Sequence, residues 1–281
     1  MLKQYKPTVD KLTKIVGKSY VLIDEQDTRH YRQGIRFGEG KVLAVVCPGT
    51  LLEQWQALQT IIEADCVVIM QAANTGLTGG STPYGDEYDR PVIIMSTRRL
   101  QGIQVILDGK QVVCLPGATL DNLERTLKPY NREPHSVIGS SCIGASVLGG
   151  VCNNSGGALV RRGPAYTEMA LYARVNESGK LELINHLGID LGNTAEEILT
   201  RLQKQDYETS QITTQTSQLA SDNRYAHDVK QVDADSPARF NADPTRLYEA
   251  SGSAGKVCVF AVRLDTFEKV ESKVFYIGSN D

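Results

Sequence analysis

The stretch "CVVIMQAANTGLTGGSTPYG" (residues 66–85) joins a short apolar run to a loop that is dense in glycine. Residues 71–85 contain four glycines and neither lysine nor arginine. A loop that leaves a strand and presents successive backbone N–H groups can surround an anion, and glycine lets the ligand approach the backbone closely. Residues 74–81 therefore predict a site for an anionic ligand, with a plain surface turn as the alternative for this loop alone.

The loop matches neither the GxGxxG dinucleotide motif nor the Walker phosphate loop, because no lysine follows its glycines. Neutral amides can replace the missing cation, since hydrogen bonds to a charged group contribute about 1.5–3 kcal/mol each. This arrangement suits a diphosphate that stays bound better than a triphosphate that is turned over. A second stretch, "GSSCIGASVLGGVCNNSGG" (residues 139–157), has six glycines and no charged residue. We interpret the pair as a cofactor site built from backbone amides.

The residues before the first loop predict a βαβ unit. Residues 42–48 form an apolar run closed by proline, and residues 50–65 show one apolar stripe at helical spacing. Thr50 and Glu53 have the spacing of a capping box at the start of this helix. Together with a strand at 66–70, this unit indicates a parallel pair of strands.

Elsewhere helices and hairpins are interspersed, which favours an α+β fold with mixed sheets over a doubly wound parallel sheet. The patterns predict helices over 7–17, 118–130 and 243–251, hairpins over 103–117 and 168–188, and strands over 91–97, 256–264 and 273–278. Residues 203–222 are rich in Gln, Ser and Thr, and we interpret them as a surface excursion or a partly disordered insert. The last expected strand has nothing after it to cover its edge, so we expect the chain to be the front part of a longer protein.

Composition excludes several classes of protein. The 281 residues are 41% hydrophobic and 22% charged, as in soluble globular proteins, and the net charge of −3 gives no support for a nucleic-acid partner. No apolar run approaches the roughly 18–20 residues of a membrane helix, and no signal peptide opens the chain, so we expect an intracellular protein. The histidines lack metal-ligand spacing, so no metal site is expected. Buried, reduced thiols are expected at Cys47, Cys66, Cys114 and Cys258, which lie in apolar runs.

Four segments together resemble one family: "MQAANTGLTGGSTP" (70–83), "REPHSVIGSSCIGASVLGGVCNNSGGALVRRGPAYTEM" (132–169), "HLGIDLG" (186–192) and "SGSAGKVCVFAVRLDTF" (251–267). They are similar to the respiratory, quinone-dependent D-lactate dehydrogenases of bacteria, flavoproteins with an FAD-binding fold of the vanillyl-alcohol oxidase (PCMH) type. The resemblance covers nearly the whole chain and is weakest at 203–222. It implies an FAD-binding domain over 1–265 that is incomplete at its C-terminal end. The implied subdomains are about 1–100 and 101–265, and residues 266–281 would begin a cap or substrate domain.

The resemblance also implies non-covalent FAD between the two subdomains. The loop around the diphosphate would consist of Ala72, Ala73, Asn74, Thr75, Gly76, Gly80 and Ser81. The flavin and ribityl side would be lined by Gly139, Ser146 and Gly156, and Val259 would contact the adenine or flavin through its backbone. Covalent flavin attachment uses a histidine or tyrosine, and the loop offers neither before Tyr84.

The implied activity is oxidation of D-lactate to pyruvate, with electrons passing through FAD to a membrane quinone. The complete protein would lie peripherally on the cytoplasmic face of the inner membrane, whereas this chain alone is expected to be soluble and inactive. The groups that bind lactate and take its proton are expected outside this chain, so no catalytic residue is assigned. The alternatives are an FAD oxidoreductase for another 2-hydroxy acid, such as glycolate, or a fragment that binds a nucleotide without catalysis.

Three of the five polar residues near the second stretch have two interpretations each. His135 could serve the site, but a structural histidine bonded to a backbone carbonyl is the simpler interpretation. Arg161 and Arg162 could reach a phosphate or substrate, against a solvated or salt-bridged role. Asn153 and Asn154 are expected to fix the glycine-rich turn through bonds to the backbone.

Overall fold

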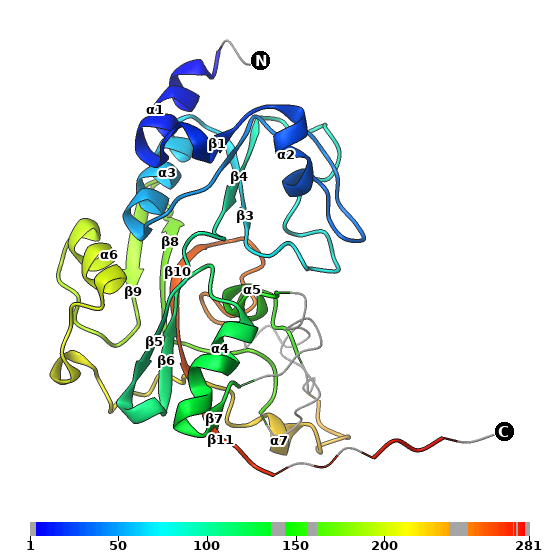
Figure 1. Cartoon of the computed structure of the whole chain (residues 1–281), viewed down its shortest axis with the longest axis vertical. Coiled ribbons are helices and arrows are strands. Elements are labelled where there is room, and N and C mark those ends of the chain that lie inside the picture. Colours follow the sequence, from blue (N-terminus) through cyan, green and yellow to red (C-terminus); the bar gives the residue numbers. More distant parts are fainter. Residues whose placement is uncertain are drawn as a thin grey trace.

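The computed structural model describes residues 4–135, 144–156, 162–235, 247–271, 273 and 275–278. Two main sheets form its centre, and helices pack on both of them (Figure 1). The four-stranded sheet has the order β1-β2-β4-β3, and the five-stranded sheet has the order β5-β6-β10-β8-β9. The first sheet is largely parallel and the second is antiparallel, which confirms the α+β expectation.

The first sheet consists of β1 (Val21–Leu22), β2 (Ala44–Val46), β3 (Val67–Gln71) and β4 (Val92–Ser96). The predicted βαβ unit is present, with α3 (Leu51–Glu63) as its crossover helix, and Thr50 Oγ1 accepts a hydrogen bond from Glu53 N at 3.1 Å. However, β2 and β3 are not direct neighbours, because β4 lies between them and pairs in parallel with both. The carboxyl ends of all three strands therefore meet at one edge of the sheet.

Helices cover both faces of this sheet. The helices α1 (Lys6–Val16) and α3 lie on one face, and α2 (Glu25–Arg32) lies on the other (Figure 1). The helix predicted over 7–17 is confirmed, and it ends at Gly17, whose φ of 87° suits glycine.

The second sheet consists of β5 (Ile103–Ile106), β6 (Gln111–Cys114), β8 (Ala170–Val175), β9 (Leu181–Asn185) and β10 (Cys258–Asp265). Both predicted hairpins and the predicted core strand are confirmed. Side chains of β10 belong to two clusters: Phe260 lies in the cluster that contains residues of α1, α3 and α6 (Ala195–Lys204), whereas Val262 lies in the cluster that contains residues of α4 (Leu120–Leu127) and α5 (Val147–Cys152). The second sheet is thus covered by helices on both faces.

Two predictions near the C-terminal end are wrong. No strand forms at the described residues of 273–278, where Phe275, Tyr276 and Ile277 are 79%, 97% and 94% exposed. Instead β11 (Phe267–Glu268) pairs with β7 (Arg132–Glu133). Of the helix predicted over 243–251, residues 243–246 lie outside the described ranges. Tyr248 and Ser251 bond to each other's backbone in a turn, so its described part is not helical.

The segment 203–222 is fastened to the second sheet. Thr213 N donates to Gly188 O at 2.8 Å, and Asp265 N donates to Ala220 O at 2.9 Å. The fully buried Arg263 donates through Nη2 to Thr213 O at 3.0 Å. The segment is therefore a surface excursion bound to the fold, and its interpretation as a partly disordered insert is wrong.

The remaining described elements are short. They are α7 (Tyr225–Asp228) and the 3₁₀ turns Lys18–Tyr20, Leu107–Gly109, Lys128–Tyr130 and Thr209–Gln211. The four cysteines expected to be buried thiols are buried and free. Among the described residues, no helix combines the length and apolarity needed to span a bilayer.

Candidate cofactor site

The first glycine-rich loop lies at the carboxyl edge of the parallel strands. Residues 72–82 follow β3, and Thr97, which follows β4, donates from its backbone N to Gln71 O at 2.8 Å. The segment after β2 reaches the same edge, because Arg99 Nη1 donates to Cys47 O at 2.7 Å. Open parallel sheets bind ligands at this edge, where loops from several strands meet.

The loop presents unused backbone donors on an open side. No backbone N–H from Ala72 to Ser81 donates to an acceptor in the parts of the chain that the structure describes. A Cβ atom placed on Gly76 or Gly80 would meet nothing within 4 Å. Residues 72–81 are half-buried or exposed, so these amides are accessible to a ligand, and a run of unpaired N–H groups fits an anionic group such as a diphosphate.

Two of the predicted residues shape the loop through their side chains. Asn74 has a left-handed backbone with a φ of 55°. Its Nδ2 donates to Gln33 O at 2.8 Å, and Ser81 Oγ donates to its Oδ1, also at 2.8 Å. The side chains of Asn74 and Ser81 thus bond within the protein. Their backbone N–H groups have no acceptor among the described residues and can donate to a ligand.

The second glycine-rich stretch is linked to the residue after β4 through the segment 116–118. Ser146 caps α5 with its hydroxyl, and the next residue, Val147, donates from N to Ala118 O at 2.9 Å. The segment just before Ala118 touches the first sheet, because Thr97 Oγ1 donates to Pro116 O at 3.2 Å. Two hydrogen bonds, one on each side of Gly117, therefore connect the start of α5 to Thr97.

Val259 lies where the two sheets meet. Its strand, β10, extends past the end of β6, because the last residue of β6 pairs with Val262. Cys258 Sγ is 3.7 Å from Met70 Sδ on β3. Gln54 Nε2 on α3 donates to Val259 O at 3.3 Å, while Gln54 Oε1 is buried with no partner among the described residues. The Val259 carbonyl thus accepts a hydrogen bond from α3, and the neighbouring Cys258 contacts β3 one residue before its end.

Gly156 and Gly139 complete the predicted set. Gly156 is exposed, and a Cβ atom there would meet nothing within 4 Å. The nearby Asn154 is 8% exposed, and its Oδ1 has no partner in the described part of the chain. Asn153 Nδ2 donates to Gly149 O at 2.8 Å, which confirms its expected role in the turn. Gly139 lies outside the described residues.

His135 is another buried polar residue near the second stretch in the sequence. His135 is 2% exposed, and burial, with a smaller effect of the Arg162 charge, lowers its pKa from 6.5 to about 4. Its Nδ1 is buried without a partner in the described ranges. Arg162 donates to Pro134 O and to Glu133 Oε1, both at 2.8 Å, so its salt-bridged role is confirmed. Arg161 lies outside the described residues.

Sequence reasoning missed Gln71 and Gln54, two buried amides beside the site. Gln71 Nε2 donates to Tyr31 O at 2.8 Å and to Ser81 O at 2.6 Å. A polar residue at the end of an apolar strand was the available signal for Gln71. Nothing local in the sequence indicates that the Gln54 side chain reaches β10, because the contact joins residues 205 positions apart.

Comparison with known proteins identifies the class. A family described as "FAD binding domain" matches residues 42–181. Among solved structures, an alkyldihydroxyacetonephosphate synthase matches with a TM-score of 0.61 at 12% identity, covering 94% of this chain and 41% of that one. A p-cresol methylhydroxylase with bound substrate matches with a TM-score of 0.58 at 14% identity, covering 95% and 44%. The chain carries an FAD-binding domain, and its fold is of the PCMH type, as the resemblance implied.

Curated relatives narrow the family further. The quinone-dependent D-lactate dehydrogenase of Haemophilus influenzae is 62% identical over 97% of this chain and 48% of the relative. The protein of the same name from Escherichia coli is 57% identical over 98% of this chain and 48% of the relative. Nearly the whole of this chain is thus closely similar to part of these quinone-dependent D-lactate dehydrogenases. It spans about half the length of the relatives it matches.

Proposed function

We propose that this chain is the FAD-binding portion of a respiratory D-lactate dehydrogenase, which oxidises D-lactate to pyruvate and passes the electrons to a membrane quinone. The observation that carries the proposal is the run of free amides from Ala72 to Ser81 within the segment that matches an FAD-binding domain. The names of relatives that are up to 62% identical support the substrate and the electron acceptor.

The proposed contacts follow the chemistry of the ligand. The amides of residues 72–76, Gly80 and Ser81 would donate to the diphosphate oxygens, because several neutral donors can hold a diphosphate where the loop itself carries no cation. Bound FAD supplies the redox chemistry, and the chain supplies its binding and orientation.

The remaining proposed contacts come from the second subdomain. Ser146, Gly139 and Gly156 would line the ribityl and flavin side, and Val259 would contact the adenine or flavin through its backbone. Binding would be non-covalent, because residues 71–83 contain neither histidine nor tyrosine.

The proposal extends to the organisation of the complete protein. The first sheet, within about 1–100, and the second sheet, within about 101–265, would form two subdomains with FAD between them. Residues 266–281 would begin the cap or substrate domain, which supplies the groups that bind lactate. A quinone acceptor implies work at the cytoplasmic face of the inner membrane, to which the complete protein would bind peripherally.

The proposal is tested by titrating this chain, freed of cofactor, with FAD and following flavin fluorescence. We expect one FAD to bind per chain and to be released into the supernatant after acid precipitation, as non-covalent binding requires. A chain that remains colourless at saturating FAD would overturn the assignment, and flavin that stays with the precipitate would overturn its non-covalent part. Addition of D-lactate should not bleach the flavin, because this chain holds no assigned substrate groups.

A further inference from the structure

We infer that Gln71 and Asn74 are positioning residues, whose side-chain amides hold the glycine-rich loop against the last turn of α2 and so keep the loop amides arranged for an anionic ligand. The inference rests on the proposed binding of the FAD diphosphate by this loop. It adds a role for two side chains to the proposed binding of the diphosphate by the backbone amides of the loop.

Gln71 joins three segments at one buried point. It is the last residue of β3 and is 2% exposed. Its Nε2 donates one hydrogen bond to Tyr31 O in α2 and the other to Ser81 O at the far end of the loop. A side-chain amide nitrogen has two hydrogens, so both are used. The start and the end of the loop are thereby held at a fixed separation.

Asn74 makes a second connection within the loop itself. Its Nδ2 donates to Gln33 O at 2.8 Å and approaches His30 O at 3.5 Å, while its Oδ1 accepts from Ser81 Oγ. The left-handed backbone at Asn74 turns the chain, so that the amide side chain faces α2. Ser81 is therefore held twice, through its carbonyl by Gln71 and through its hydroxyl by Asn74.

The two amides also satisfy the C-terminal end of α2. The last carbonyls of a helix have no partner within the helix, and this end carries a partial negative charge. The carbonyls of Tyr31 and Gln33 accept from Gln71 and Asn74. Without these donors, unpaired carbonyls would lie beside the loop and oppose an anion, so the amides support anion binding electrostatically as well as sterically.

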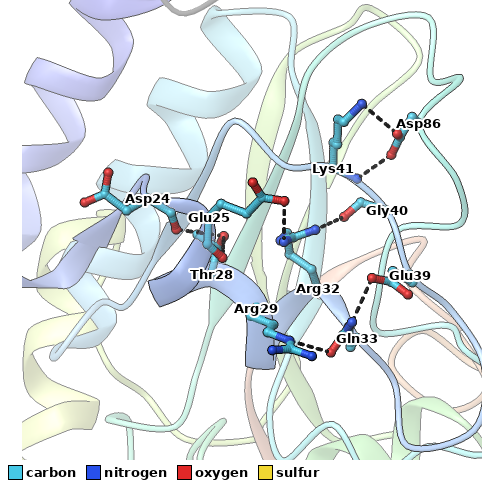
Figure 2. A network of polar contacts seen from close by, with 10 residues as sticks. All are labelled: Asp24, Glu25, Thr28, Arg29, Arg32, Gln33, Glu39, Gly40, Lys41 and Asp86. Atoms are coloured by element: carbon cyan, nitrogen blue, oxygen red, sulfur yellow. Dashed lines mark hydrogen bonds and ion pairs between the residues drawn. The ribbon is translucent and has the colours of Figure 1, made fainter.

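The end of α2 also bonds to the segment that follows it. Figure 2 shows Arg32 of α2 between Glu25 and the carbonyl of Gly40, each 3.3 Å away. The neighbouring Lys41 bonds to Asp86, beyond the end of the loop, through its backbone N and its Nζ, both at 2.8 Å. Exposed ion pairs contribute only about 0–1 kcal/mol each. Together they nevertheless connect α2 to Gly40 and the adjoining Lys41 to Asp86, which helps to fix the helix that Gln71 and Asn74 contact.

The test compares FAD affinity in this chain with that of matched variants. Gln71→Met keeps the length of the side chain and removes both donors, and Gln104→Met makes the same change in the second sheet, where Gln104 Nε2 donates to Leu202 O at 2.6 Å. Asn74→Gly keeps the left-handed backbone and removes the amide, and Asn131→Gly does the same at another left-handed asparagine, with a φ of 53°.

We expect Gln71→Met and Asn74→Gly each to raise the Kd for FAD about tenfold or more, which is the effect of losing one or two hydrogen bonds. The two controls should leave Kd within about twofold of the unchanged chain. Hydrogen exchange of the amides of α2 in the FAD-free chain should also quicken in the first pair and not in the controls, a readout that is independent of bound flavin.

The outcomes separate the inference from the proposed function. If the unchanged chain binds FAD and all four variants bind it equally well, the positioning role is wrong and the proposed function stands. If each variant loses affinity in proportion to its loss of unfolding free energy, controls included, the two amides serve only the fold and the inference is overturned. If the unchanged chain takes up no FAD, both fall. Should Gln71→Met fail to fold, Asn74→Gly at the partly exposed loop decides the matter alone.

Discussion

Ser81 Oγ donates a hydrogen bond to Asn74 Oδ1 at 2.8 Å, which closes the glycine-rich loop seven residues after Asn74. The bond sets the direction of the whole amide, because an Oδ1 that accepts from Ser81 turns Nδ2 toward the carbonyls of α2. The loop therefore needs an amide at this position, and a carboxylate of the same shape cannot replace it.

Asn74→Asp should weaken FAD binding more than Asn74→Gly does. The new carboxylate oxygen would face Gln33 O and carry a negative charge beside the proposed diphosphate site. We expect a rise in Kd of about 100-fold, near the upper end for a hydrogen bond that involves a charged group. Flavin fluorescence titration measures it, with the unchanged chain and Asn74→Gly in parallel. Equal affinity of the Asp and Gly variants would contradict the electrostatic part of the argument.

Gly76→Ala and Gly79→Ala should separate binding from folding. A Cβ atom at Gly76 meets nothing in the protein, so the free energy of unfolding should change by less than about 0.5 kcal/mol, whereas FAD affinity falls because the side of the loop that receives the ligand is blocked. Gly79 has a φ of 75° and a Cβ atom there would lie 3.3 Å from the Phe37 backbone. That variant should lose about 1 kcal/mol or more of stability even without FAD. Urea unfolding of both FAD-free variants measures this difference in stability. A Gly76→Ala variant less stable than Gly79→Ala would contradict the prediction.

Arg263→Met should destabilise the chain strongly without touching the cofactor site. The guanidinium of Arg263 is buried, and burial lowers its pKa. It donates to Leu187 O at 3.0 Å, to Thr213 O at 3.0 Å and to Gln111 Oε1 at 2.7 Å. Each abandoned acceptor costs about 1–3 kcal/mol, so we expect a loss of at least 3 kcal/mol in urea unfolding.

The same variant tests the segment 203–222. Hydrogen exchange at Thr213 should quicken, because the segment loses the side chain that holds it to β10. Unchanged exchange there would show that the other contacts of the segment suffice. Arg32→Met, which removes a mostly buried guanidinium that bonds to Gly40 O and Glu25 Oε1 away from this segment, serves as the control.

His135 should make stability fall with acidification. Burial lowers its pKa to about 4, below the ordinary 6.5, so the unfolded chain binds a proton that the folded chain refuses between these values. The contribution of His135 to the free energy of unfolding is complete above pH 6.5 and is lost as the pH falls toward 4. A pKa shift of this size corresponds to about 3 kcal/mol. His135→Gln should flatten the difference in unfolding free energy between pH 7 and pH 4.5. Parallel curves for the variant and the unchanged chain would refute the role.

The sequence predicted those parts of the fold that local patterns control. The strand Val67–Gln71, the cap at Thr50 and the hairpin turns depend on neighbouring residues, and all are present. The insertion of β4 between β2 and β3 joins strands far apart in the chain, and no local period encodes strand order. The apolar run at 275–277 was wrongly predicted as a strand. An apolar pattern alone does not indicate whether a partner strand is present, and these residues are exposed.

The candidate site also combines features that the sequence indicates with features that it does not. The sequence indicated accessible backbone donors in the first loop, because a glycine-dense, uncharged loop after a strand can present its N–H groups to an anion, with a plain surface turn as the alternative. The side-chain supports of the site were not predictable, because Gln71 reaches across 40 positions to Tyr31. A glutamine at a strand end looks the same in the sequence whether it faces solvent or a helix end.

The bond from Gln54 to Val259 O joins a helix that covers the first sheet to the central strand of the second sheet. A ligand that binds only the folded form raises stability by mass action, and one that lies at this junction requires both sheets to be assembled at once. The supply of flavin in the cell would then govern the lifetime of newly made chains, since those that lack it open more often to proteases.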